Sequence, residues 1–191
     1  MEIRDNSNQH NDVTEIDMSK NLKRIEKLEQ VLEEYYNKAI LLASAHGLME
    51  KRYSIIESCL MYPSIILASS SMFITTSNVV TLKNKCIDHS PNSYFDYLSA
   101  GISYAILLFT GVQSYVSPGK HKERSNQFTS EFSDIASDIK QFVAENNYGY
   151  DELKYFTNIN LNSLDTWVSI SDTIPDSVMR MAKENHIHVK L

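Results

Sequence analysis

An all-α fold is predicted by three features of the sequence. Glycine and proline are scarce, with 5 and 4 residues among 191, which disfavours a turn-rich β architecture. Segments 19–49 and 128–142 repeat apolar residues at steps of three and four, the spacing of one helix face. Between them lie two uncharged runs, 58–82 and 97–117, where about 20 apolar residues suffice to cross a bilayer. The sequence therefore predicts a two-helix transmembrane hairpin continuous with a cytoplasmic antiparallel helical stalk, followed by short C-terminal helices.

The chain is expected to fold as one unit with three parts, because 191 residues hardly suffice for two large independent domains. Residues 1–18 are polar and acidic and hold no apolar core of a cleaved signal peptide, so we expect a disordered N-terminal lead. Residues 19–149 form the helical stalk with its transmembrane hairpin. Residues 150–191 form a C-terminal helical segment, in which Pro175 suits the start of the last short helix.

The first predicted helix begins near Ser19, a residue type that caps helix starts. Its apolar stripe follows a heptad pattern and includes one histidine, which we interpret as a partly buried packing residue. The stripe consists of Ile25, Leu28, Leu32, Tyr35, Ala39, Leu42, His46 and Met49. The same register continues through Tyr53, Ile56 and Leu60, so one long helix is expected to pass from water into the first span.

A second stripe follows the second uncharged run. It consists of Phe128, Phe132, Ile135, Ile139 and Phe142, and it matches the first stripe in period. If the two spans are antiparallel, the helices that flank them emerge on the same side. We therefore expect the two stripes to pack as an antiparallel, coiled-coil-like stalk.

Two observations favour a lipid environment for the uncharged runs over a soluble four-helix bundle. A soluble helix normally carries charge every turn or two on its wet face, whereas these neighbouring runs carry none. The basic residues before the first run and after the second run also outnumber those of the connecting loop, which has only Lys83 and Lys85. The flanking cations are Lys38, Lys51, Arg52, Lys120, Lys122 and Arg124. The prediction is a two-pass integral membrane protein with both termini cytoplasmic; a soluble helical-bundle interaction module is the alternative.

Hydroxyl and small side chains recur at helical spacing within both runs. We take eight polar residues as candidates for helix packing or for lining a pore: Ser64, Ser71, Thr75, Asn78, Ser99, Ser103, Thr110 and Ser114. Small residues let helices approach closely in lipid, and hydroxyls can bond across the contact. The same side chains could instead face water in a pore made by several copies, since one hairpin is too small to enclose a channel.

Sequence motifs for chemistry are missing, so we expect no enzyme, cofactor or metal site. There is no P-loop, G-x-G-x-x-G, H-E-x-x-H or G-x-S-x-G motif, and the two cysteines have no metal-ligand spacing. A formal charge of −6 without a concentrated basic face argues against nucleic-acid binding. The cluster Lys120, Lys122 and Arg124 is interpreted as a juxtamembrane anchor for lipid head groups.

The order of these segments resembles the SLATT family of two-transmembrane effector domains over about residues 22–182. The likeness lies in the hairpin pattern "KRYSIIESCLMYPSIILASSSMFITTS" and "YLSAGISYAILLFTGVQSYVSPGKHKERSNQF", in the helix "FTSEFSDIASDIKQF", and in the later "TIPDSV". In prokaryotes such domains accompany nucleotide-second-messenger or stress-sensor systems and are thought to perturb membranes or form pores; relatives occur in large DNA viruses and protists. No sensor domain is attached in this sequence, so the resemblance is to a stand-alone viral or protist-like member of the family.

The resemblance implies an oligomeric membrane protein of SLATT type, a homo-oligomer whose other partner is the lipid bilayer. Its expected function is that of a pore-forming or membrane-perturbing effector without enzymatic activity. The alternative is a non-conducting membrane scaffold or a structural protein of a virion membrane.

Overall fold

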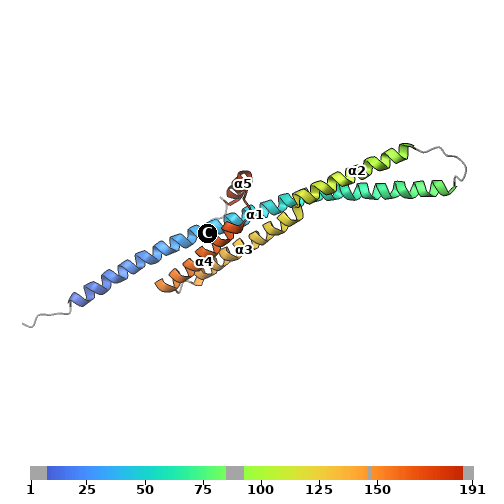
Figure 1. The fold of residues 1–191 in the computed structure, drawn as a ribbon. Coiled ribbons are helices and arrows are strands. Elements are labelled where there is room, and N and C mark those ends of the chain that lie inside the picture. The colour runs from blue at the N-terminus through green and yellow to red at the C-terminus, as the bar shows by residue number, and fades with distance from the viewer. Residues whose placement is uncertain (1–7, 85–92, 146–147, 187–191) are drawn as a thin grey trace, which may run out of the picture. The chain divides into compact units, whose positions relative to one another are not determined.

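Helices make up every regular element that the structure describes. The computed structural model describes the backbone of residues 8–84, 93–145 and 148–186, and the side chains of 20–76, 97–145 and 148–185. In chain order the elements are α1 (Asn8–Asn84), α2 (Ser93–Val116), α3 (Pro118–Glu145), α4 (Tyr150–Ile170) and α5 (Asp176–His186), as Figure 1 shows. The all-α prediction is confirmed for these residues. The predicted loop between the spans falls largely outside them.

The chain divides into two compact units. One consists of the residues up to Leu48 together with those from Ser125 onward, and we name it the bundle unit. The other, Met49–Arg124, we name the hairpin unit. Helix α1 contributes residues to both units, α2 belongs to the hairpin unit, and α4 and α5 belong to the bundle unit.

Helix α1 is longer than the sequence pattern predicts. It begins at Asn8 rather than near Ser19, so residues 8–18 of the expected lead belong to it. That stretch contains neither glycine nor proline, the residues that most strongly oppose a helix, and a helix already formed extends easily. Pro63 lies inside α1, although proline cannot donate the backbone hydrogen bond to the residue four positions before it.

The core of the bundle unit joins three helices. Its most buried large side chains are Leu32 of α1, Phe132 and Ile139 of α3, and Leu153 and Leu164 of α4. Other members of the predicted stripes pack around them, namely Ile25, Leu28, Tyr35, Ala39, Leu42, Phe128, Ile135 and Phe142. The core therefore contains residues of α4 in addition to the two predicted stripes of α1 and α3.

The third helix changes which face of α1 is covered. Tyr35 and Leu42 of the predicted stripe are only half-buried, whereas Tyr36 and Ala43, one position later, are buried. A helix that touches two neighbours buries a wider stripe than the seam of a two-stranded coiled coil. At the far end of the core, Phe142 stacks on Phe156 of α4 with ring centroids 3.9 Å apart.

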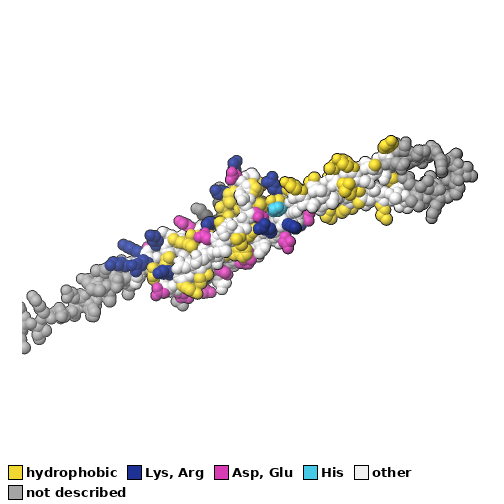
Figure 2. Space-filling model, viewed as in Figure 1, with side chains coloured by type: hydrophobic (Ala, Val, Ile, Leu, Met, Phe, Trp, Pro, Cys, Tyr) yellow, Lys and Arg dark blue, Asp and Glu magenta, His cyan; other side chains and the backbone are white. Residues whose placement is uncertain are grey.

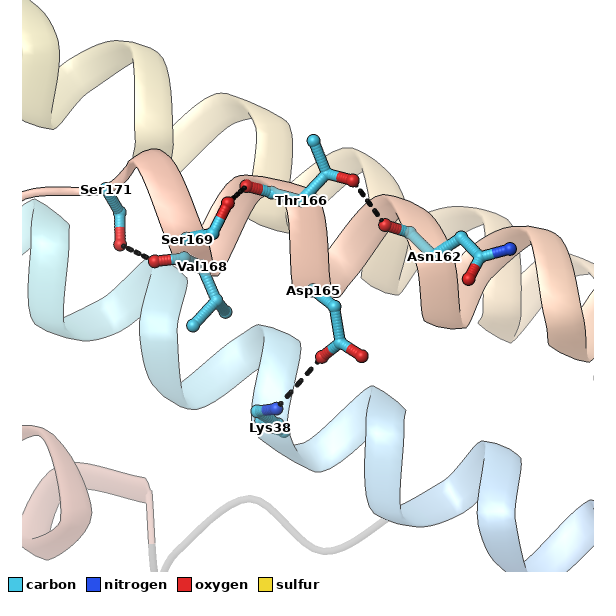
Figure 3. Close-up of polar contacts among 7 residues, drawn as sticks. All are labelled: Lys38, Asn162, Asp165, Thr166, Val168, Ser169 and Ser171. Carbon is cyan, nitrogen blue, oxygen red and sulfur yellow. Dashed lines mark hydrogen bonds and ion pairs between the residues drawn. The ribbon is translucent and has the colours of Figure 1, made fainter.

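Helix α4 is held mainly by this apolar contact. An ion pair between α4 and α1 joins Lys38 Nζ to Asp165 Oδ1 at 3.7 Å (Figure 3). Both side chains are about half exposed, so this ion pair adds little stability. Hydroxyls near the end of α4 donate to carbonyls of their own helix, as Thr166 does to Asn162 at 2.7 Å.

Helix α5 starts directly after Pro175. The carbonyl of Pro175 accepts hydrogen bonds from the backbone N–H groups of Val178 at 2.9 Å and Met179 at 3.0 Å. Val178 and Ala182, four residues apart on one face, are both buried. The short final helix that the sequence predicts after this proline is therefore present.

The Phe132→Ala variant tests the core of the bundle unit. Phe132 is 0% exposed, so its truncation leaves a cavity and should lower the free energy of unfolding by about 3–5 kcal/mol. The matched control is Ser133→Ala, because Ser133 is exposed on the same helix and alanine favours a helix. Chemical unfolding followed by circular dichroism measures both; an equal effect of the two changes would contradict the packing described.

Candidate functional site

The hairpin unit carries large apolar side chains on its outside. Phe73 of α1 is 74% exposed, and Leu107 and Tyr115 of α2 are 71% and 92% exposed. The others of this kind are Ile55, Met61, Tyr62, Ile65, Ile66, Met72, Tyr97, Leu98, Tyr104, Leu108 and Val112. Figure 2 shows these apolar side chains spread over the unit, and residues 58–76 and 97–119 include no charge. Soluble monomers rarely expose so large an apolar surface, and such surfaces typically mark sites that contact lipid or another protein.

A second stripe of the hairpin faces inward. In Figure 1, α2 lies beside the last part of α1. The half-buried residues recur at helical spacing on both helices: Leu60, Ser64, Leu67, Ser71 and Ile74 on α1, and Ser99, Ile102, Ala105, Ile106 and Phe109 on α2. None of these described positions is fully buried, because two helices can cover only one side of each other.

Hydroxyls on α1 bond within their own helix. The Ser64 Oγ donates to the carbonyl of Leu60 at 2.8 Å, four residues earlier. Ser58, Ser69, Ser70, Thr75 and Thr76 donate to their own i−4 carbonyls in the same way, at 2.8–2.9 Å. Because a bonded hydroxyl proton needs no water, these polar side chains can lie in an apolar medium at small cost.

The eight candidate residues of the sequence differ in exposure. Ser64, Ser71 and Ser99 are half-buried on the inward stripe. Thr75, Ser103, Thr110 and Ser114 are exposed, and the side chain of Asn78 lies outside those described. The structure thus brings the first three toward the contact between α1 and α2 and leaves the next four on the outer surface of the hairpin.

A tight turn ends the hairpin on the α2 side. Ser117, between α2 and α3, has a positive φ of 44°, and its N–H donates to the carbonyl of Gln113 at 2.9 Å. Its Oγ donates to the carbonyl of Ser114 at 2.7 Å. A left-handed residue closes α2, and Pro118 then fits the first position of α3, where its missing N–H costs nothing. The sequence suggests the break through its Pro-Gly pair but gives no sign of strain at a serine.

Charged residues lie close to this turn within the hairpin unit. The Lys122 Nζ donates to Glu57 Oε2 at 3.1 Å, linking the start of α3 to α1. Gly119 is adjacent, since a Cβ there would lie 3.3 Å from Glu57 Oε1. The rings of Tyr53 and His121 stack with centroids 5.2 Å apart. Of the predicted basic anchors, Lys120 and Arg124 are exposed, while Lys122 is partly neutralised by Glu57.

A buried histidine lies in the bundle unit. His46 is 0% exposed, and its ring centroid is 5.1 Å from that of Phe128 and 5.7 Å from that of Phe132. Neither ring nitrogen has a hydrogen-bond partner in the structure. Burial lowers the pKa of His46 below 6.5, and the negative charge of Asp172 opposes that shift. The sequence pattern predicts His46 as partly buried but gives no sign of Asp172.

Helix α1 is the one described helix that is both long and apolar enough to cross a membrane, within Lys20–Thr76. The core helix of a soluble protein passes the same test when it is buried, but the apolar stretch of α1 is 0% buried inside the structure. Among the described residues no group of His, Cys, Asp and Glu could hold a metal ion. The site is therefore a surface rather than a pocket with chemical groups.

Comparison of this chain with models of protein families, with curated proteins and with solved structures finds no match. The resemblance to the SLATT family consequently remains an expectation based on the sequence pattern.

The lowered pKa of His46 predicts acid destabilisation of the bundle unit. Its charged form is disfavoured in the folded state, so its contribution is fully present above pH 6.5 and is lost as pH falls through 6.5 toward the lower folded pKa. The denaturant concentration at the unfolding midpoint should therefore decrease as the pH is lowered from 7.5 to 5. The His46→Leu variant should show a weaker pH dependence. Denaturant titrations at several pH values measure it; an unchanged pH dependence in the variant would contradict the prediction.

Proposed function

We propose that this protein is an oligomeric integral membrane protein of SLATT type, whose hairpin unit inserts into a bilayer with both termini on the cytoplasmic side. The observation that carries the proposal is the outward position of the apolar side chains on both helices of that unit. Helices are suited to lipid because their backbone hydrogen bonds are made internally. The Ser and Thr hydroxyls of α1 that donate to carbonyls of the same helix likewise make their hydrogen bonds internally.

The basic residues support the proposed orientation. Lys51 and Arg52 are exposed on α1 just before the uncharged stretch, and Lys120 and Arg124 are exposed just after α2 ends. In an antiparallel hairpin these positions lie at the same end. Cations at one end of a membrane hairpin favour the cytoplasmic side and can contact anionic head groups.

The proposed activity is membrane perturbation or pore formation by several copies. Exposed Thr75, Ser103, Thr110 and Ser114 give the outer surface polar positions that a further copy could contact or water could wet. The alternative is a non-conducting scaffold, including a structural protein of a virion membrane. It is favoured by the intrahelical hydroxyl bonds on α1, because groups bonded in this way do not require water.

Charge introduced on the hairpin tests membrane insertion. Ile66→Asp and Leu107→Asp place a carboxylate at positions that are 64% and 71% exposed. In water such exposed changes cost little, whereas near the middle of a bilayer each should cost about 2.5–3.5 kcal/mol. We expect both variants to lose flotation with liposomes and resistance to carbonate extraction, in which the unchanged protein remains with the lipid.

The matched control is Met181→Asp, because Met181 is an exposed apolar residue of α5 in the bundle unit, 53% exposed. It should float like the unchanged protein. Extraction of the unchanged protein by carbonate without detergent would overturn the membrane proposal and leave the soluble interaction module.

A measurement of ion conduction distinguishes a pore-forming protein from a non-conducting scaffold. Replacing Ser71, Thr75 and Asn78 together by valine should abolish ion flux through reconstituted bilayers if these residues line a water path, while the oligomer persists. If they hold helices together, the same changes should weaken assembly, with about 0.6 kcal/mol for each hydrogen bond. Planar-bilayer current and the mass of the solubilised oligomer distinguish these results. Stable oligomers of unchanged protein that pass no ions would leave the scaffold.

A further inference from the structure

An open groove lies along α1 and α3 in the bundle unit. Its volume is about 710 Å³. Tyr36 of α1 and Ile139 of α3, which are both buried, form its floor together with Val143, which is 42% exposed. The groove therefore offers an apolar strip that is open to a further partner.

The groove lies on the side of α1 away from α4. Lys38 faces α4, because its Nζ lies 3.7 Å from Asp165 Oδ1. Glu29, which lines the groove, precedes Lys38 by nine residues, about two and a half helical turns, so the two side chains leave opposite sides of α1. The described helices therefore cover one side of the pair formed by α1 and α3 and leave the groove side open.

The wall that α1 contributes is acidic. Glu26, Glu29 and Glu33 follow one another at steps of three and four, so they form one row on the same side of the helix, which we name the acidic row. The lining also contains one cation, Lys140 of α3, which leaves an excess of two negative charges. The acidic row repels an anionic lipid surface or a nucleic-acid backbone and attracts a cationic partner.

Tyr148, which follows α3, fixes one end of the groove. Its ring stacks on Phe142 with centroids 4.9 Å apart, and its hydroxyl donates to Glu29 Oε1 at 2.7 Å. Burial, together with this hydrogen bond and the charge of Glu29, raises the pKa of Tyr148 to about 12, so the hydroxyl keeps its proton at neutral pH. Glu29 is thus oriented before a partner arrives, and its carboxylate can accept further hydrogen bonds. Groups that are already ordered lose less entropy on binding.

The dimensions of the groove suit one short helix. The lining residues of α1 extend from Glu26 to Tyr36, which is about 15 Å at 1.5 Å per residue. A helix of about three turns has this length. Side chains of such a helix can interdigitate with those of two neighbouring helices. Together with α1, α3 and α4 it would complete a four-helix arrangement.

We propose that the groove binds a basic amphipathic helix of another protein. The apolar stripe of that helix lies on Tyr36, Ile139 and Val143, and its Lys or Arg side chains along one edge face the acidic row. This is the helix-in-groove mode of peptide recognition, in which apolar anchors recur at steps of three and four. The inference goes beyond the proposed membrane function and does not depend on it, because it uses residues of the bundle unit alone.

A synthetic peptide tests the proposal with the full-length protein in a non-ionic detergent. The probe is a fluorescent helical peptide of about 14 residues, with leucines at steps of three and four and lysines along one edge of the leucine stripe. One control peptide has glutamate in place of lysine, and another has glutamine in place of leucine. Fluorescence anisotropy, measured against detergent alone, should show saturable binding of the lysine peptide and about tenfold weaker binding of each control.

Variants of the acidic row test where the peptide binds. Glu26→Gln combined with Glu33→Gln removes two exposed carboxylates and should weaken binding about threefold to tenfold at low ionic strength, because exposed ion pairs contribute modestly. The matched control combines Glu34→Gln with Glu152→Gln, two exposed carboxylates that do not line the groove. It should leave the affinity unchanged; an equal loss in both pairs would overturn the acidic row as the binding surface.

The apolar floor is tested by a separate substitution. Val143→Lys places a cation on the floor and should weaken binding of the lysine peptide about tenfold. The control is Leu22→Lys, because Leu22 is an apolar residue of α1 that is 57% exposed and does not line the groove. It should bind like the unchanged protein. Circular dichroism checks that each variant is folded, and unchanged binding by folded Val143→Lys would overturn the proposal.

Cross-linking locates the contact and tests a different occupant. A photoreactive leucine in the peptide should cross-link to the groove floor. Cross-links elsewhere, no saturable binding, or equal binding of the glutamate peptide would each overturn the proposal. A photoreactive group is also attached to Val143→Cys, in protein whose Cys59 and Cys86 are replaced by serine. If it joins two copies of the chain in the absence of peptide, the groove belongs to a second copy and the proposal is wrong.

Discussion

The apolar side chains of α1 are covered unevenly along residues 20–76, and the difference between the two units follows from this. In the bundle unit α3 and α4 bury that face, with Leu32 and Ala39 removed from solvent. Along residues 58–76 of α1, α2 is the described helix that lies beside it, and residues such as Ile66 and Phe73 stay exposed. Since burial of apolar surface is the main stabilising contribution to folding, the described residues gain it for the bundle unit and leave much of the apolar surface of the hairpin unit exposed.

Periodicity and charge were sufficient to predict the helices, because both are local properties of the chain. Steps of three and four placed Phe132 and Ile139 on a buried face, and the described residues of the two uncharged runs are helical. The contribution of Leu153 and Leu164 was not predicted, because a weak local pattern does not tell which helices meet. The complete burial of His46 also arises from contacts between residues far apart in the sequence, with the rings of Phe128 and Phe132.

The hydroxyl-rich sequence of residues 58–76 in α1 illustrates how a polar composition can coexist with an apolar surface. Serine and threonine in a helix can return their proton to the carbonyl one turn earlier, and six described residues of α1 do so. Composition alone treats such residues as polar, whereas the geometry lowers the cost of removing them from water. The position of a hydroxyl on the helix, and the group to which it donates, therefore say more about its role than the residue type alone.

The exposed apolar side chains of the hairpin unit limit how copies of the chain can meet through it. The two helices present different residues on their outer sides, such as Phe73 on α1 and Leu107 on α2. A contact that joins unlike sides of neighbouring copies is head-to-tail, and it closes into a ring only if the rotation between neighbours divides a full turn. A contact that joins the same side of both copies is complete with two copies and cannot extend. A pore made by several copies therefore requires the head-to-tail contact, whereas a scaffold is compatible with either one.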